Sequence, residues 1–118
     1  MREERGQIVG DVVIYEPFEL WGTVAGNVKV IDGGKLYMRG AIYGDLIVEE
    51  GGRVHVYGNV AGNLIMEPKT KVILSGVVGK NATNTGGRLF IERLAKVMGK
   101  VRTNDHEKNI GETKDSRR

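Results

Sequence analysis

The chain has 118 residues, a formal net charge of +3 and no cysteine. This length fits one domain, and the lack of cysteine excludes disulfides and thiolate metal sites. The weak, mixed charge argues against a nucleic-acid partner. No apolar run approaches the roughly 20 residues of a membrane span, and the opening MREERGQ lacks the apolar stretch of a signal peptide. We therefore expect a soluble, cytoplasmic protein without membrane insertion.

The N-terminal residues 1–5 are charged, and we expect them to be frayed. A coil-like segment, residues 6–21, then precedes three gapless repeats of eighteen residues. These repeats are GTVAGNVKVIDGGKLYMR (22–39), GAIYGDLIVEEGGRVHVY (40–57) and GNVAGNLIMEPKTKVILS (58–75). A fixed period in this range is the signature of a solenoid. Residues 6–21 match the repeat after a loss of two residues at one corner.

Within each repeat, apolar residues stand two apart, which is the periodicity of a strand with alternate side chains facing inward. Glycine pairs and Gly-Asn or Gly-Asp steps separate these apolar pairs and permit corners. Three short strands and three corners make one triangular coil, and stacked coils pair their strands in parallel. The equivalent places then form inward columns, such as Val24, Ile42 and Val60.

The fifth repeat, from Gly76, departs from the pattern, and its alignment puts the polar Asn81 and Thr83 at inward places. After Glu92 the apolar spacing becomes i, i+3, i+4, i+7, which favours a short helix over 92–101 that caps the last coil. The rival interpretation makes this segment the start of a sixth coil. Residues 102–118 are charged and almost free of apolar side chains, so we expect a disordered tail.

These patterns predict an all-β, single-stranded parallel β-helix of about five coils over residues 6–101. The Gly-x-Val-x-Gly-Asn/Asp-Val step resembles the bactofilin family of bacterial polymer-forming cytoskeletal proteins, over about residues 6–92. The resemblance implies a right-handed β-helix, end-to-end stacking and no nucleotide cofactor. Two departures are the expected C-terminal helix, which would block one stacking end, and the lack of an apolar N-terminal membrane-targeting stretch.

Eighteen is also three times six, so the period fits left-handed hexapeptide β-helices, which include acyltransferases and one class of carbonic anhydrase. Those enzymes need placed histidines, whereas the repeats hold only His55, at an outward place. Glu49 and Glu50 point to opposite faces of a strand and cannot act on one substrate. The sequence thus indicates no enzyme, no cofactor and no metal site.

Two outward surfaces carry residue types that favour contacts. The first is a candidate protein-binding surface rich in Trp, Tyr and Arg, the types enriched at binding hot spots. It comprises Trp21, Tyr37, Arg39, His55, Tyr57 and Ile73. The second is a candidate lateral self-association surface of outward apolar residues. It comprises Val13, Tyr15, Ile31, Ile47 and Ile65.

The function predicted from these observations is a non-enzymatic scaffold that associates with itself and with other proteins. The alternative is a capped, non-polymerising protein-binding module, such as a toxin-neutralising immunity protein. The two functions differ at the chain's C-terminal end, because a capping helix would stop growth there.

Overall fold

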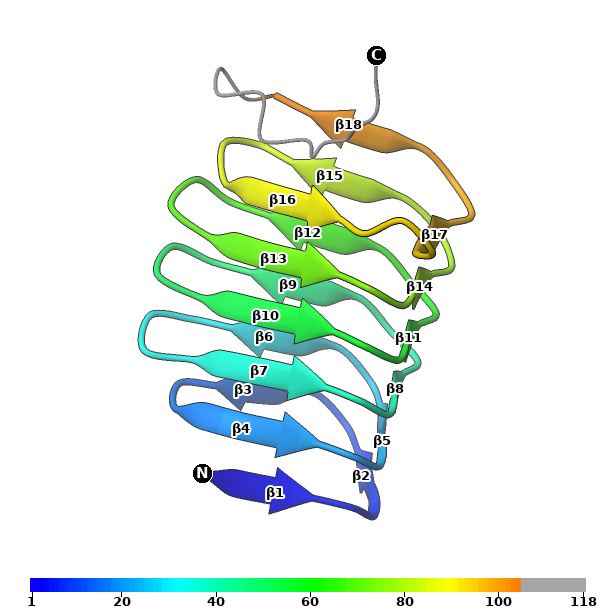
Figure 1. Ribbon diagram of the computed structural model, residues 1–118. Helices are drawn as coiled ribbons and strands as arrows, with labels where there is room; N and C mark the ends of the chain where they lie inside the picture. Colours follow the sequence, from blue (N-terminus) through cyan, green and yellow to red (C-terminus); the bar gives the residue numbers. More distant parts are fainter. Residues whose placement is uncertain (105–118) are drawn as a thin grey trace.

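The eighteen-residue repeats fold into a parallel β-solenoid of six coils, as the computed structural model shows for residues 1–104 (Figure 1). Each coil contributes one short strand to each of three six-stranded sheets. The first sheet contains β1 (Arg2–Glu4), β4 (Pro17–Leu20), β7 (Lys35–Met38), β10 (Arg53–Val56), β13 (Lys71–Leu74) and β16 (Arg88–Ile91). The second contains β2 (Gln7–Val9), β5 (Thr23–Ala25), β8 (Ala41–Ile42), β11 (Asn59–Val60), β14 (Val77–Val78) and β17 (Lys96–Val97). The third contains β3 (Val12–Ile14), β6 (Val28–Val30), β9 (Leu46–Val48), β12 (Leu64–Met66), β15 (Ala82–Asn84) and β18 (Val101–Thr103).

The solenoid winds in the right-handed sense. In Figure 1 the strands of the first sheet lie in front and run from left to right, and the third sheet returns behind them while the chain climbs. The directions of the backbone hydrogen bonds between coils agree with right-handed winding. Inward Val28 donates to Asp45 of the following coil, whereas outward Tyr43 donates to Val24 of the preceding coil. The left-handed alternative is therefore not the one that this chain adopts.

The predicted register is confirmed in the central coils. Val24 pairs with Ile42, and Ile42 lies in one column with Val60, each step being eighteen residues. All three side chains are buried, with 1% or less of their surface exposed. The first coil is two residues shorter, because the corner between β3 and β4 is shorter than the later ones. The core is therefore a set of apolar columns running along the solenoid.

The glycine that opens each repeat is explained by close approach of neighbouring coils. A Cβ atom on Gly40 would collide with the carbonyl oxygen of Gly22, one coil below, and the same relation links Gly58 to Gly40. Positive φ explains a different set, the corner glycines Gly33 and Gly51, both with φ of 88°. The repeat thus uses glycine for two separate physical reasons.

A ladder of Asn and Asp side chains joins each coil to the next. In every step the Oδ1 atom of one coil accepts a hydrogen bond from the backbone amide of the equivalent residue in the following coil. The accepting residues are Asp11, Asn27, Asp45, Asn63 and Asn81, with distances of 2.7 to 3.0 Å. The last amide in the ladder belongs to Lys100, whose own side chain cannot accept.

The expected helix over 92–101 is wrong, and a sixth coil takes its place. β17 pairs with β14, and β18 pairs with β15, both in parallel. The corner before β17 is two residues longer than its predecessor, which disguised the repeat by shifting its apolar residues. The helical spacing arose because Val97 and Val101 lie on separate strands that both face the core.

Three further expectations need correction. In the fifth coil no residue is lost before Gly79, so Ala82 and Asn84 take the inward places, and Asn81 and Thr83 face outward. At the N-terminus, Arg2–Glu4 form β1 and pair with β4 instead of fraying. Of the expected tail, Arg102 and Thr103 belong to β18, Asn104 follows it, and residues 105–118 lie beyond the residues described. No helix able to span a bilayer occurs among residues 1–104.

Candidate protein-binding surfaces

One outward column at the corner between the first and second sheets alternates arginine with aromatic rings. We call Arg5, Trp21, Arg39 and Tyr57 the arginine–aromatic column. The guanidinium carbons of Arg5 and Arg39 both lie 4.9 Å from the Trp21 ring centroid, on the two coils that flank it. Arg39 also lies 4.4 Å from the Tyr57 ring. Each contact joins successive coils, and such cation–π contacts contribute about 0.5–1 kcal/mol at exposed sites.

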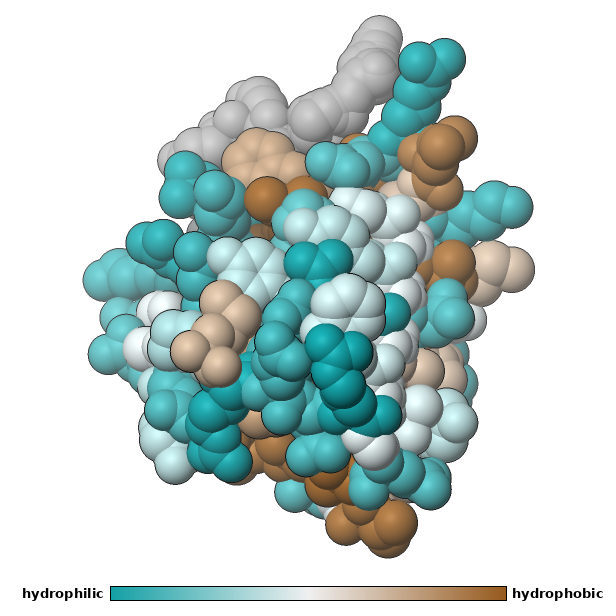
Figure 2. Space-filling model, turned by 60° about the horizontal axis from the view of Figure 1, so that its bottom comes forward, coloured by the Kyte–Doolittle hydropathy of each residue, from teal (hydrophilic) through white to brown (hydrophobic). Residues whose placement is uncertain are grey.

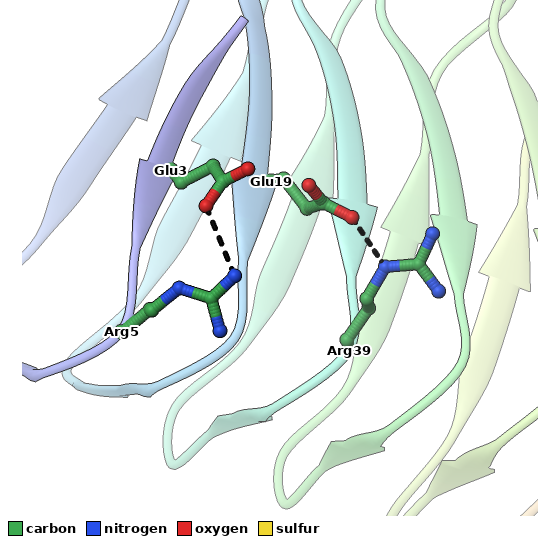
Figure 3. A network of polar contacts seen from close by, with 4 residues as sticks. All are labelled: Glu3, Arg5, Glu19 and Arg39. Atoms are coloured by element: carbon green, nitrogen blue, oxygen red, sulfur yellow. Dashed lines mark hydrogen bonds and ion pairs between the residues drawn. The ribbon is translucent and has the colours of Figure 1, made fainter.

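Carboxylates hold these guanidinium groups in place (Figure 3). Arg39 Nε donates to Glu19 Oε2 at 2.6 Å, and Arg5 pairs with Glu3 at 3.1 Å. The Glu19 side chain is only 15% exposed, so the first pair is the better shielded of the two. The hydrogen bond from Arg39 lowers the pKa of the Glu19 carboxyl group below its ordinary value, against the opposing effect of desolvation.

A polar chain continues the surface toward the C-terminal end. The His55 ring stacks on Tyr57, with centroids 3.8 Å apart and planes 15° from parallel. His55 Nε2 lies 3.0 Å from Ser75 Oγ, and that hydroxyl donates to Glu92 at 2.6 Å. Since the hydroxyl carries one proton, Ser75 accepts from His55, which places a proton on Nε2. Burial, reinforced by the charge of Arg39, lowers the pKa of His55, although Glu92 opposes the shift.

The structure brings together four residues of the predicted protein-binding surface, namely Trp21, Arg39, His55 and Tyr57. Trp21 and Tyr57 keep 43% and 40% of their surface exposed. Arginines of the two flanking coils cover the ring of Trp21, and Arg39 of the preceding coil and His55 of the same coil cover that of Tyr57, so both rings can offer a partner mainly their edges. The other two predicted residues, Tyr37 and Ile73, flank His55 in its own outward column on the first sheet and are half-buried.

Sequence reasoning missed Arg5 as a member of this surface, because it was assigned to a frayed terminus. The signal was present in the repeat. Arg5 immediately precedes Gly6, just as Trp21 precedes Gly22 and Arg39 precedes Gly40. Aligning the residue that precedes each of these glycines would have put Arg5 in the column.

The predicted lateral surface lies on the outer face of the third sheet and at the corner that follows it. Val13 and Tyr15 are 52% and 58% exposed, while Ile31, Ile47 and Ile65 are half-buried. Val13 and Ile47 line a shallow hollow. Lys29 stands between them in the same column and pairs with Glu49 at 3.4 Å. This ion pair divides the apolar residues into two smaller groups.

Among residues 1–104, no group of three or more His, Cys, Asp or Glu side chains is arranged to hold a metal ion. Comparisons of the whole chain with protein-family models, with curated proteins and with solved structures give no significant match.

Proposed function

We propose that this chain is a non-enzymatic scaffold that associates with itself through the ends of its solenoid, in the manner of the bactofilins. The observation that carries the proposal is the open state of both ends within residues 1–104. β1, β2 and β3 each have a strand partner on one side only, and among the described residues so do β16 and β17. Unpaired strand edges are templates for pairing with another chain.

The core is also open at these ends. In the middle of the solenoid the inward residues Ile42 and Leu46 are completely buried. In the first coil, Ile8 and Val12 pack against the core but stay half-exposed, as do Ile91 and Val97 in the sixth. Stacking of a second solenoid would remove this apolar surface from water, which favours association. The sixth coil supports growth, because it offers strands where a helix would have closed the end.

A second candidate function is a protein-binding module that remains monomeric. The arginine–aromatic column favours it, since Trp, Tyr and Arg dominate binding hot spots. The two functions are compatible, because the column lies along the side of the solenoid and only one of its residues, Arg5, belongs to a terminal coil.

Sedimentation and negative-stain microscopy of the wild-type protein at micromolar concentration test the proposal. A scaffold should give concentration-dependent species and rods that lengthen in steps of whole solenoids. Deleting residues 93–118 removes β17 and β18 and should shorten or weaken these assemblies. A sharp monomer at every concentration would refute the scaffold and leave the binding module.

The contribution of the column to partner binding needs a separate variant. Tyr57→Ala should weaken association with a protein partner by about 2 kcal/mol or more if Tyr57 is a hot spot. The matched control is Tyr43→Ala, a 56% exposed tyrosine directly after β8 and outside the column. Equal binding by both variants and the wild type would rule the column out.

A further inference from the structure

We propose that copies of this chain stack head to tail, the sixth coil of one against the first coil of the next. Two pairs of opposite charges, Glu92 with Arg5 and Lys100 with Asp11, would fix the polarity and the register of the joint. This inference rests on the end-to-end association proposed above and specifies which ends meet.

The two terminal coils carry opposite net charge. Residues 1–16 hold two basic and four acidic side chains, so their net charge is −2. Residues 88–104 hold five basic side chains and one acidic side chain, so their net charge is +4. Unlike ends therefore attract, whereas two C-terminal ends, or two N-terminal ends, repel each other. Figure 2, with the N-terminal end turned forward, shows hydrophilic (teal) residues interspersed with hydrophobic (brown) ones there, so this end offers both polar and apolar groups to a contact.

The first charged pair follows from the arginine–aromatic column. Arg5 occupies the same place in the first coil as Trp21 in the second, since Glu4 pairs with Leu20. Glu92 occupies that place in the sixth coil, since Ile91 pairs with Leu74 beside Ser75. A copy stacked in continuous register would put its Arg5 about 4.8 Å, one strand spacing, from Glu92 of its neighbour.

The second charged pair follows from the Asn/Asp ladder. Asp11 is the first residue of this ladder, and Lys100 stands at its last place, where its amide binds Asn81. Lys100 is exposed, and among residues 1–104 it forms no ion pair. In the same continuous register, Lys100 would face Asp11 of the next copy. One alignment of the two molecules therefore satisfies both pairs.

Apolar residues match in this same alignment. Val97 is in the column of Ile8, through β14 and β5, and Val101 is in the column of Val12. On the outer face of the second sheet, Met98 is in the column of Val9, and the two are 67% and 83% exposed. In this alignment, three apolar contacts between the two copies would thus form in addition to the two charged pairs.

Charged residues also occupy the inward places of β1, opposite the apolar end of β16. Arg2 and Glu4 stand in the columns of Phe18 and Leu20. The Arg2 guanidinium reaches Glu16 at the corner, 3.0 Å away, so its charge has a carboxylate partner within its own chain. Glu4 accepts a hydrogen bond from the Gly6 amide at 3.1 Å. The joint can therefore form without leaving either charge unpaired.

Reciprocal charge reversal tests the polarity, because a head-to-tail joint always brings residue 5 against residue 92. The single variants Arg5→Glu and Glu92→Arg place like charges at every joint, so each alone should need at least about tenfold more protein to assemble at low salt. An equimolar mixture of the two should recover the wild-type critical concentration, and so should the double variant. Sedimentation and light scattering measure each case, and higher salt should reduce all the differences.

Arg53→Glu is the matched control, a charge reversal at an exposed arginine midway along the solenoid, and it should leave assembly unchanged. Thermal unfolding of each variant reports whether the fold is kept. The reciprocal pair Asp11→Lys and Lys100→Asp repeats the charge-reversal test at the second charged pair. If the single variants assemble as well as the wild type and their mixture assembles better, like ends meet and the head-to-tail inference is overturned. A wild-type protein that never assembles overturns the proposed scaffold itself.

Discussion

Arg39 pairs with Glu19 of the preceding coil, and its guanidinium group lies against the rings of both Trp21 and Tyr57. The planar group makes the two cation–π contacts simultaneously with the ion pair, which the ammonium of lysine cannot reproduce. We expect Arg39→Lys to lower the free energy of unfolding by about 0.5–1 kcal/mol, the value of an exposed cation–π contact. Arg53→Lys, on the same face but in no ion pair among the described residues, should change it by less than about 0.5 kcal/mol in urea denaturation.

The core column of Val24, Ile42 and Val60 predicts a much larger loss of free energy of unfolding. Ile42 is completely buried between Val24 and Val60. Ile42→Asp would leave a buried charge without a partner, at a cost of about 3–5 kcal/mol or more. Because coils depend on their neighbours, we expect cooperative loss of the fold, measured by circular dichroism. Ala41→Asp, one residue earlier and facing outward, is the control, and normal unfolding of the Ile42 variant would contradict the register.

Close coil contact at the repeat glycines gives a third prediction. A Cβ atom on Gly58 would meet the carbonyl oxygen of Gly40, so the backbones must separate. We expect Gly58→Ala to destabilise the protein by about 1–3 kcal/mol, as overpacking does. At Gly6 the nearest atom to an added Cβ is 3.4 Å away, at the end of the Glu4 side chain. Gly6→Ala should therefore be tolerated, and equal melting temperatures for the two variants would argue against the packing explanation.

His55 gives a prediction for pH. Its pKa is lowered in the folded state, chiefly by burial, so below about pH 6.5 the unfolded chain binds more protons than the folded one. The stability contributed by the neutral imidazole is therefore present above that pH and is lost as pH falls toward the folded-state pKa. His55→Gln removes this titration, so the stability difference between wild type and variant should move in favour of the variant between pH 7.5 and pH 5.5. If the melting temperatures of the two proteins change by the same amount with pH across this range, the lowered pKa of His55 is contradicted.

The fold could be predicted from the sequence because one physical constraint repeats. Each coil must present apolar residues to the same columns, so the period of eighteen fixes the strands and their register. The prediction was wrong where this constraint is relaxed. At the sixth coil, two added residues at one corner shifted Val97 and Val101 from their expected places, and the four-residue step between them, which every coil has, then resembled helical spacing.

Asn84 shows a different reason for error. The expected loss of one residue before Gly79 put Asn81 and Thr83 at the inward places, but the structure puts Ala82 at the first of these places and Asn84 at the second. In the structure its side chain donates to the Gly87 carbonyl at 2.9 Å and accepts from the Gly86 and Gly87 amides. These bonds satisfy a buried polar group and shape the corner before β16, and no sequence pattern reveals such local pairing. The candidate surfaces were predictable as columns, but the stacking within them depends on side-chain conformations.

The constant eighteen-residue step from coil to coil makes the central coils interchangeable units. Removing residues 40–57 would join Arg39 to Gly58, which opens a repeat as Gly40 does, and both terminal coils would be unchanged. The molecule could therefore be shortened or lengthened by internal duplication in increments of one strand spacing, about 4.8 Å. A protein built in this way can act as an adjustable spacer, in which evolution sets the length of the rod independently of the chemistry at its ends.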